Sequence, residues 1–179
     1  MLKIWGRNNS VNVKKVLWAA EELGLAYERI DAGGAFGRVD TPEYLAMNPN
    51  GLVPVLQDGD LTLFESNTIV RYLAARDAGP VWIADAGRRA SAEKWMDWTT
   101  SFAAPFREVI FGLVRTPPEK RDLAAIEKGR VACARLFGIA DGALAQSPWL
   151  SGANFGIADI ALRPFASVWY ELAIELPAH

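Results

Sequence analysis

Short apolar runs fill the first half of the chain, whereas apolar positions in the second half recur with helical spacing. Residues 2–5 alternate as a strand does, and residues 27–31 form a second run of that kind. Between them lies an apolar set spaced for one helix face, which Gly24 ends: Val13, Val16, Leu17, Ala20 and Leu23. A strand, helix and strand in this order predict a right-handed parallel crossover.

The stretch 47–71 is the most informative part of the sequence. A loop rich in Gly and Pro leads to Val55-Leu56, and Asp58-Gly59 separates this run from residues 61–64. Asp-Gly supplies the backbone dihedrals that a tight hairpin needs. Ser66 then precedes Ile69, Tyr72 and Leu73, so it reads as the N-cap of a helix. We therefore expect strand, turn, strand and helix here, after a helical turn that starts near Pro42.

The second half is predicted to be all helical. We expect a first domain at residues 1–76, a linker at 77–89 rich in turn residues, and a helical domain at 90–179. Within it, one helix spans residues 90–114 with an interruption at Pro105, and a second begins near Pro117. Its stripe is Leu123, Ile126, Cys133, Phe137, Ala140 and Leu144. A last helix begins after Gly156, with Asp159 placed for a capping box and Pro164 for a kink.

Composition and charge narrow the function classes. The 179 residues are 51% hydrophobic and 22% charged, with a net charge of −2 and interleaved signs, which argues against nucleic-acid binding. No run of about 18 apolar residues predicts a membrane span, and no secretory signal is visible. The lone Cys133 reads as a buried structural thiol, and the only histidine, His179, is the last residue. A His-based triad or His/Cys metal cluster is therefore excluded, so no metal is expected, and the partners are small molecules or copies of the chain.

Two features of the stretch 47–71 indicate a ligand site. The bond before Pro54 has two accessible isomers, and the cis form would present the N–H and C=O of Val53 to an extended peptide. Ser66 has two interpretations: it only caps the helix, or the free N–H groups there hold a carboxylate while Glu65 meets an ammonium. The second interpretation describes an amino-acid head group.

The runs NPNGLVPVL, DG and LFESNTIVRYL resemble the glutathione-binding half of a cytosolic glutathione S-transferase, of the bacterial, serine-type and theta-like kind. The resemblance covers nearly the whole chain and implies an α/β plus all-α fold. A thioredoxin-like N-terminal domain of order β-α-β-α-β-β-α would precede an all-helical C-terminal domain. It also implies that Val53 and Pro54 hold the cysteinyl part of glutathione, and that Glu65 and Ser66 hold its γ-glutamyl end.

The resemblance gives the start of the first helix a chemical role. Ser10 stands where the serine classes place the residue that activates the thiol, and Asn12 matches the residue used in a related bacterial class that reduces disulfides. A hydroxyl at a helix N-terminus stabilises a thiolate by a charge-assisted hydrogen bond and by the helix dipole. Without the resemblance, both residues are ordinary helix-start residues, and capping is the simpler interpretation.

The chain departs from the family pattern at two places. Leu52 stands where many members have a lysine for the glycyl carboxylate, and Asn50 or Arg38 are the candidates to replace it. Members also usually continue past the last helix, whereas this chain stops at Pro177-Ala178-His179. Because that segment often covers the second substrate, we expect its loss to affect substrate scope.

The resemblance also implies partners. Glutathione would be a co-substrate, and the other substrate would be a small hydrophobic electrophile. The candidate residues for the pocket that binds this electrophile are Phe36, Phe102, Phe106 and Ile110. Each of them could instead pack in the core. Trp95 and Trp98 are candidates for a domain or dimer interface. A cytoplasmic homodimer acting in detoxification is the expected setting.

Three functions follow from these features. The first is a transferase that adds the glutathione thiolate to small hydrophobic electrophiles. The second is a glutathione-dependent disulfide or peroxide reductase that uses Asn12. The third is a non-catalytic binding module, which the presence of Ser10, Glu65 and Ser66 disfavours.

Overall fold

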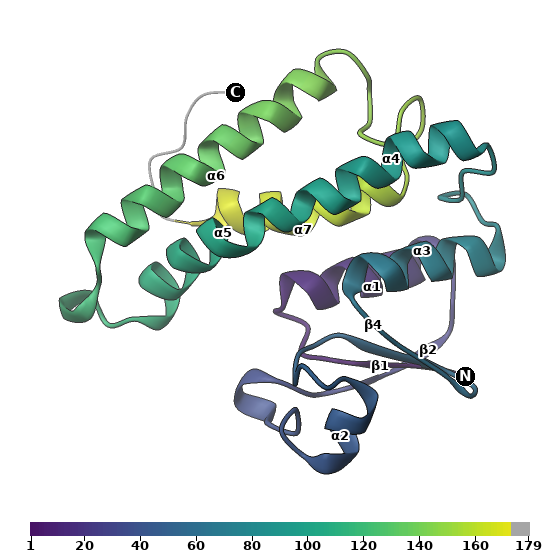
Figure 1. Ribbon diagram of the computed structural model, residues 1–179, viewed down its shortest axis with the longest axis horizontal. Helices are drawn as coiled ribbons and strands as arrows, with labels where there is room; N and C mark the ends of the chain where they lie inside the picture. Colours follow the sequence, from purple (N-terminus) through teal and green to yellow (C-terminus); the bar gives the residue numbers. More distant parts are fainter. Residues whose placement is uncertain (173–179) are drawn as a thin grey trace. The chain divides into compact units, whose positions relative to one another are not determined.

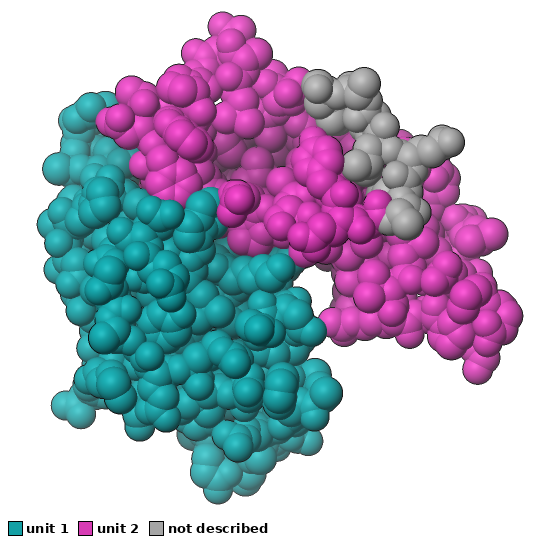
Figure 2. Space-filling view, turned by 180° about the vertical axis from the view of Figure 1, so that it is seen from behind, with its two compact units in different colours: residues 1–89 teal, residues 90–179 magenta. Residues whose placement is uncertain are grey.

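The computed structural model of the chain describes residues 1–172, so His179 lies outside the described residues. The chain divides into two compact units, residues 1–89 and 90–179 (Figure 2). The first unit contains a mixed sheet with helices, and the described part of the second unit is helical (Figure 1). The predicted fold class is therefore confirmed.

The first unit has the predicted order of elements. They are β1 (Leu2–Trp5), α1 (Val11–Glu22), β2 (Tyr27–Ile30), the 3₁₀ turn η1 (Gly34–Phe36), α2 (Pro42–Met47), β3 (Val55–Asp58), β4 (Leu61–Phe64) and α3 (Ser66–Asp77). The strands lie in the order β2-β1-β3-β4, with β1 and β2 parallel and the other pairs antiparallel. The parallel crossover through α1 is therefore confirmed.

Helices cover both faces of this sheet. The helices α1 and α3 pack together on one face, and α2 lies at the other (Figure 1). Tyr44 of α2 is buried against Trp5, with the two rings edge to face at 6.2 Å. Fully buried apolar side chains such as Ile4, Val16 and Ile69 form the core. This packing fixes α1 and α3 side by side, so that their N-terminal ends lie close together.

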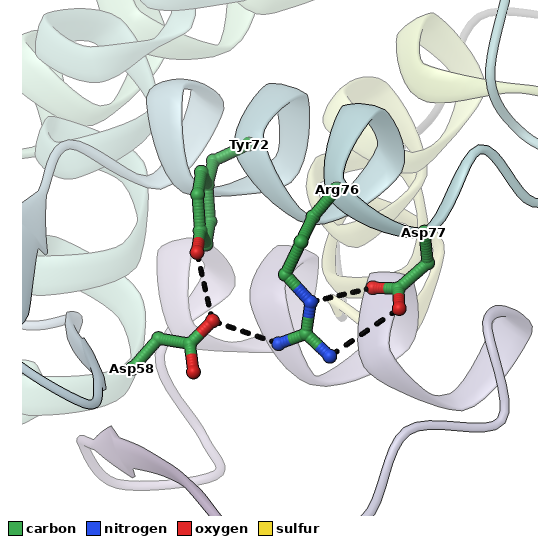
Figure 3. Close-up of polar contacts among 4 residues, drawn as sticks. All are labelled: Asp58, Tyr72, Arg76 and Asp77. Carbon is green, nitrogen blue, oxygen red and sulfur yellow. Dashed lines mark hydrogen bonds and ion pairs between the residues drawn. The ribbon is translucent and has the colours of Figure 1, made fainter.

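A polar cluster ties the β3–β4 hairpin to α3 (Figure 3). Asp58, at the end of β3, accepts hydrogen bonds from the Tyr72 hydroxyl at 2.7 Å and from Arg76 at 2.8 Å. Arg76 also pairs with Asp77 at 2.9 Å. The hydrogen bond from Tyr72 lowers the pKa of the Asp58 carboxyl, and Asp58 raises the pKa of Tyr72 in return. The predicted turn residue therefore also anchors the hairpin to the helix.

The second unit differs from prediction in where its helices begin and end. Its elements are α4 (Ala86–Trp98), the 3₁₀ turn η2 (Thr99–Phe102), α5 (Ala103–Ile110), the π-helical turn η3 (Phe111–Arg115), the 3₁₀ turn η4 (Pro118–Lys120), α6 (Leu123–Leu144) and α7 (Ile157–Glu171).

Local caps explain two of these differences, and the position of Pro105 explains a third. The helix α4 begins inside the expected linker, because the Asp85 carboxylate accepts the N–H of Arg88 at 2.8 Å. Pro105 does not interrupt a helix: it lies in the first turn of α5, where a missing N–H is tolerated. The helix expected near Pro117 begins at Leu123, because the Asp122 side chain caps it through the N–H of Ala125.

The core of the second unit is aromatic. Phe102 is fully buried and packs against Phe137 and Phe165, while Phe106 meets Phe165 edge to face at 5.1 Å. Cys133 is also buried, as predicted, and burial raises the pKa of its thiol to about 12. Leu123 and Leu144 were expected on the same buried stripe, but each lies at an end of α6 and is exposed.

The start of α7 is held by side chains that substitute for a capping serine. Gly156 is the N-cap, as predicted, and Asp159 accepts its N–H at 3.1 Å, together with the N–H of Leu150 at 2.8 Å. The Ser151 hydroxyl accepts the N–H of Ala158 at 3.0 Å. Ser151 therefore provides the capping contact that Gly156 lacks, and α7 continues through Pro164.

Candidate functional site

The candidate site lies where three segments of the first unit converge: the start of α1, the start of α3 and the turn before β3. Gly6, in the loop that leads to α1, brings two of them together. A Cβ at Gly6 would lie 2.4 Å from the side chain of Val13 and 3.3 Å from Cβ of Val53, and the backbone there has φ of 153°. Only glycine therefore allows this close approach.

Ser10 is the N-cap residue of α1, with extended backbone dihedrals and a partly exposed side chain. In the described part of the chain its hydroxyl makes no capping hydrogen bond to the helix. The hydroxyl thus lies at the positive end of the α1 dipole and does not cap the helix. Ser10 is therefore the N-cap by position, but its hydroxyl does not make the capping contact.

Ser66 was predicted to be the N-cap of α3, but this is wrong: it is the first residue of that helix. Glu65 takes the cap position with φ of 70°, an uncommon conformation for a residue other than glycine, and turns the chain sharply from β4 into α3. The Ser66 side chain is buried and its hydroxyl donates to Oδ1 of Asn12 at 3.3 Å. Asn12 and Ser66 are 54 residues apart in sequence, so this contact joins the two helix starts.

Val53 precedes Pro54 across a cis peptide bond. The β3 ladder begins at Val55, and within residues 1–172 the N–H and C=O of Val53 take part in no backbone hydrogen bond. The carbonyl of Leu52 is held by two donors at 2.8 Å each, the Asn48 amide and the Tyr44 hydroxyl. Val53 therefore presents its peptide groups from a firmly held turn. Sequence reasoning missed Asn48, whose place in an NPNG loop was the available signal and whose side chain the structure shows to be buried.

The residues proposed for the glycyl carboxylate differ in their settings. Asn50 is exposed, and its side chain donates to Oδ1 of Asn48 at 3.0 Å. Arg38 is exposed, with φ of 70°. Sequence reasoning missed Arg7, whose side chain crosses the glycines after β2. A Cβ at Gly33 would lie 3.4 Å from its Nη1 and 3.2 Å from Val53. Arg7 therefore places a cation near the side chain of Val53.

Sequence reasoning also missed Lys15, a charged residue of α1 that is only 3% exposed. Its ammonium donates to Oδ1 of Asn67 at 3.4 Å. Burial lowers the pKa of Lys15 to about 8, and the nearby carboxylate of Glu65 limits that decrease. Lys15 lies off the apolar stripe that begins at Val13, so no local signal in the sequence indicated its burial.

The residues predicted to line a pocket for an electrophile differ in their exposure. Phe36 lies in η1 and is half exposed, and Ile110 ends α5 and is half buried. Phe102 and Phe106 belong to the aromatic core of the second unit, so core packing accounts for their burial. Among residues 1–172, no cluster of His, Cys, Asp or Glu is suited to a metal ion, and no helix is both long and apolar enough to cross a membrane.

Two family models match the chain. Residues 1–75 match "Glutathione S-transferase, N-terminal domain", and residues 102–179 match "Glutathione S-transferase, C-terminal domain". The chain is 54% identical to glutathione S-transferase GstB of Escherichia coli K12, over 92% of this chain and 81% of that protein. It is 31% identical to the disulfide-bond oxidoreductase YfcG of the same organism, over 92% of this chain and 79% of that protein.

A solved structure is similar along almost the whole chain. It is the theta-class glutathione S-transferase of Xanthomonas axonopodis pv. citri with glutathione bound, with 53% identity and a TM-score of 0.96. The match covers 99% of this chain and 86% of that one.

Proposed function

The chain belongs to the glutathione S-transferase family, and on that premise we propose that its site binds glutathione and transfers the thiolate to small hydrophobic electrophiles. The observation that carries this proposal is the position of the Ser10 hydroxyl. It stands at the start of α1 without capping that helix, while the Ser66 contact to Asn12 brings the start of α3 beside it.

We assign the ends of glutathione to separate parts of the site. The backbone of Val53 pairs with the cysteinyl residue, as one strand pairs with another. The first turn of α3 receives the γ-glutamyl carboxylate at its free N–H groups, and Glu65 receives the ammonium. The ligand then lies across all three converging segments.

Arg7 is our candidate for binding the glycyl carboxylate, because this chain has Leu52 at the position where many family members have a lysine. Its guanidinium and the side chain of Val53 both approach the same point above Gly33. Leu52 itself is 65% exposed and apolar, so it offers no charge to a carboxylate. A guanidinium binds a carboxylate through two parallel hydrogen bonds, which suits this role.

The chemistry follows from the ionisation of the thiol. A free thiol has a pKa of about 8.5, so few molecules are thiolates at neutral pH. The Ser10 hydroxyl donates a hydrogen bond to the sulfur, and the α1 dipole favours its negative charge, so the thiol proton leaves to solvent. The sulfur then forms a bond to the electrophilic carbon, and the leaving group departs with its electron pair. We expect the enzyme to act in detoxification as a cytoplasmic homodimer.

A second candidate function is glutathione-dependent reduction of disulfides or peroxides. The 31% identity to a protein named as a disulfide-bond oxidoreductase favours it, as does the exposed position of Asn12 at the same helix start. Asn12 would then donate to the sulfur in place of Ser10. The retained Ser10, Glu65 and Ser66 argue against a non-catalytic module.

The test combines glutathione titration by calorimetry with conjugation of chlorodinitrobenzene. We expect Ser10→Ala to lower kcat by roughly 10²–10³-fold with little change in glutathione affinity, because one donor to the developing charge is lost. Ser91→Ala, which changes an exposed serine of α4, is the matched control. Unchanged turnover in Ser10→Ala would remove Ser10 from this role. Loss of disulfide reduction in Asn12→Ala, without loss of conjugation, would support the second function.

A further inference from the structure

Lys15 lies where a charge is costly. A buried ammonium loses its hydration and is retained only where other groups or a function require it. Lys14, its neighbour on α1, is partly exposed, so the two adjacent lysines differ in their access to water. Burial lowers the pKa of Lys15, because the ammonium loses most of its hydration.

The groups opposite Lys15 belong to the proposed γ-glutamyl site. Its ammonium contacts Asn67, while Asn12, one turn earlier on α1, contacts Ser66. Asn12 and Lys15 are three residues apart, so they lie on one face of α1, and Ser66 and Asn67 are consecutive in the first turn of α3. Two side-chain contacts therefore join the helix that carries Ser10 to the turn that carries Glu65 and Ser66.

The dipole of α3 also acts on the charge of Lys15. The N-terminus of α3 is the positive end of its dipole, so an ammonium beside it is unfavourable unless negative groups are near. Glu65 is one such group, and its field at Lys15 is favourable. A carboxylate bound at the first turn of α3 would be the second. The buried cation and the helix end thus both favour an anion at this place.

We propose that Lys15 is a positioning residue for the γ-glutamyl end of glutathione. It holds the first turn of α3 against α1 and adds a buried positive charge that favours the α-carboxylate of the ligand. Lys15 does not touch the reacting sulfur in this assignment, so it acts on binding of one end of the substrate and not on thiol ionisation. The inference rests on the proposed function.

The test uses two thiol substrates that differ only at the γ-glutamyl end. Glutathione carries that group and cysteinylglycine lacks it, so their ratio of kcat/KM for conjugation measures the contribution of the γ-glutamyl site. We expect Lys15→Met to lower this ratio by roughly tenfold or more, because a charged contact is lost, and to raise KM for glutathione with little change in kcat. Lys14→Met is the matched control and should leave the ratio unchanged.

Each outcome decides something different. A purely structural role for Lys15 would lower kcat/KM for both thiols equally and would overturn the proposal, as would an unchanged ratio. If Lys15→Met does not fold, Lys15→Gln serves as a second neutral variant that keeps a hydrogen-bond donor for Asn67, and the same fall in the ratio is expected. If the wild-type protein conjugates neither thiol and binds no glutathione, the proposed function itself fails and the role of Lys15 falls with it.

Discussion

A glycine in the contact between α5 and α6 offers a sharp test of the packing of the helical unit. Gly129 is buried within α6. A Cβ at this position would lie 2.7 Å from the backbone carbonyl oxygen of Pro105 and 3.0 Å from the side chain of Val109. A backbone oxygen cannot rotate away, so the alanine variant forces the two helices apart. Gly142, in the same helix, has no heavy atom within 4 Å of its added Cβ.

The two positions separate helix propensity from packing. Alanine is favoured over glycine inside a helix by about 1 kcal/mol, and both variants share this gain. Overpacking costs about 1–3 kcal/mol, and the contact with a backbone atom places Gly129 toward the upper end of that range. We expect Gly142→Ala to raise the free energy of unfolding by up to about 1 kcal/mol, and Gly129→Ala to lower it by about 1–2 kcal/mol.

The assay is urea unfolding of both variants and the wild type, followed by circular dichroism. The corresponding shift in Tm is about 2–4 °C for each kcal/mol in a chain of this size. If Gly129→Ala is as stable as Gly142→Ala, the close approach of α5 and α6 at this glycine is refuted.

Three further results are expected. Asp159→Ala should lower the free energy of unfolding, measured by urea titration, by at least about 3 kcal/mol. The reason is that the variant leaves the N–H groups at the start of α7 without an acceptor. A loss below about 1 kcal/mol would contradict this. Tyr72→Phe should cost about 1 kcal/mol, since it removes the donor to Asp58, and equal stability of the two proteins would show that this hydrogen bond contributes nothing. The folded pKa of Lys15, about 8, lies below its ordinary value of 10.5, so the unfolded chain binds more protons in between. The stability of the wild type relative to Lys15→Met should therefore rise by about 3 kcal/mol from pH 8 to pH 10.5, and a difference that is constant with pH would contradict the burial of this charge.

Local patterns predicted most of the first unit. Asp58-Gly59 predicted the hairpin and residues 2–5 the first strand, because turn chemistry and alternation act over a few neighbouring residues. The helix ends were predicted less well. Pro105 and Pro117 were read as boundaries, whereas Asp85 and Asp122 set the starts of α4 and α6. Proline is tolerated in a first turn, so its presence alone does not locate a helix end.

The candidate site shows the same division. Val53, Pro54, Glu65 and Ser66 were expected from motifs of a few residues, and the family they indicated is the family to which the chain belongs. Lys15 and Arg7 were not expected, since each is an ordinary surface residue type in a short window of sequence.

Short motifs and the spacing of apolar positions were enough to identify the fold class and the family, but they did not locate the starts of α4 and α6. Three features could be known only from the folded chain: Ser66 contacts Asn12, Lys15 is buried against Asn67, and the Ser10 hydroxyl does not cap its own helix. These contacts join residues more than 50 positions apart, and they exist because α1 and α3 pack together on one face of the sheet. Burial then gives Lys15 a pKa and a role that its local sequence does not contain.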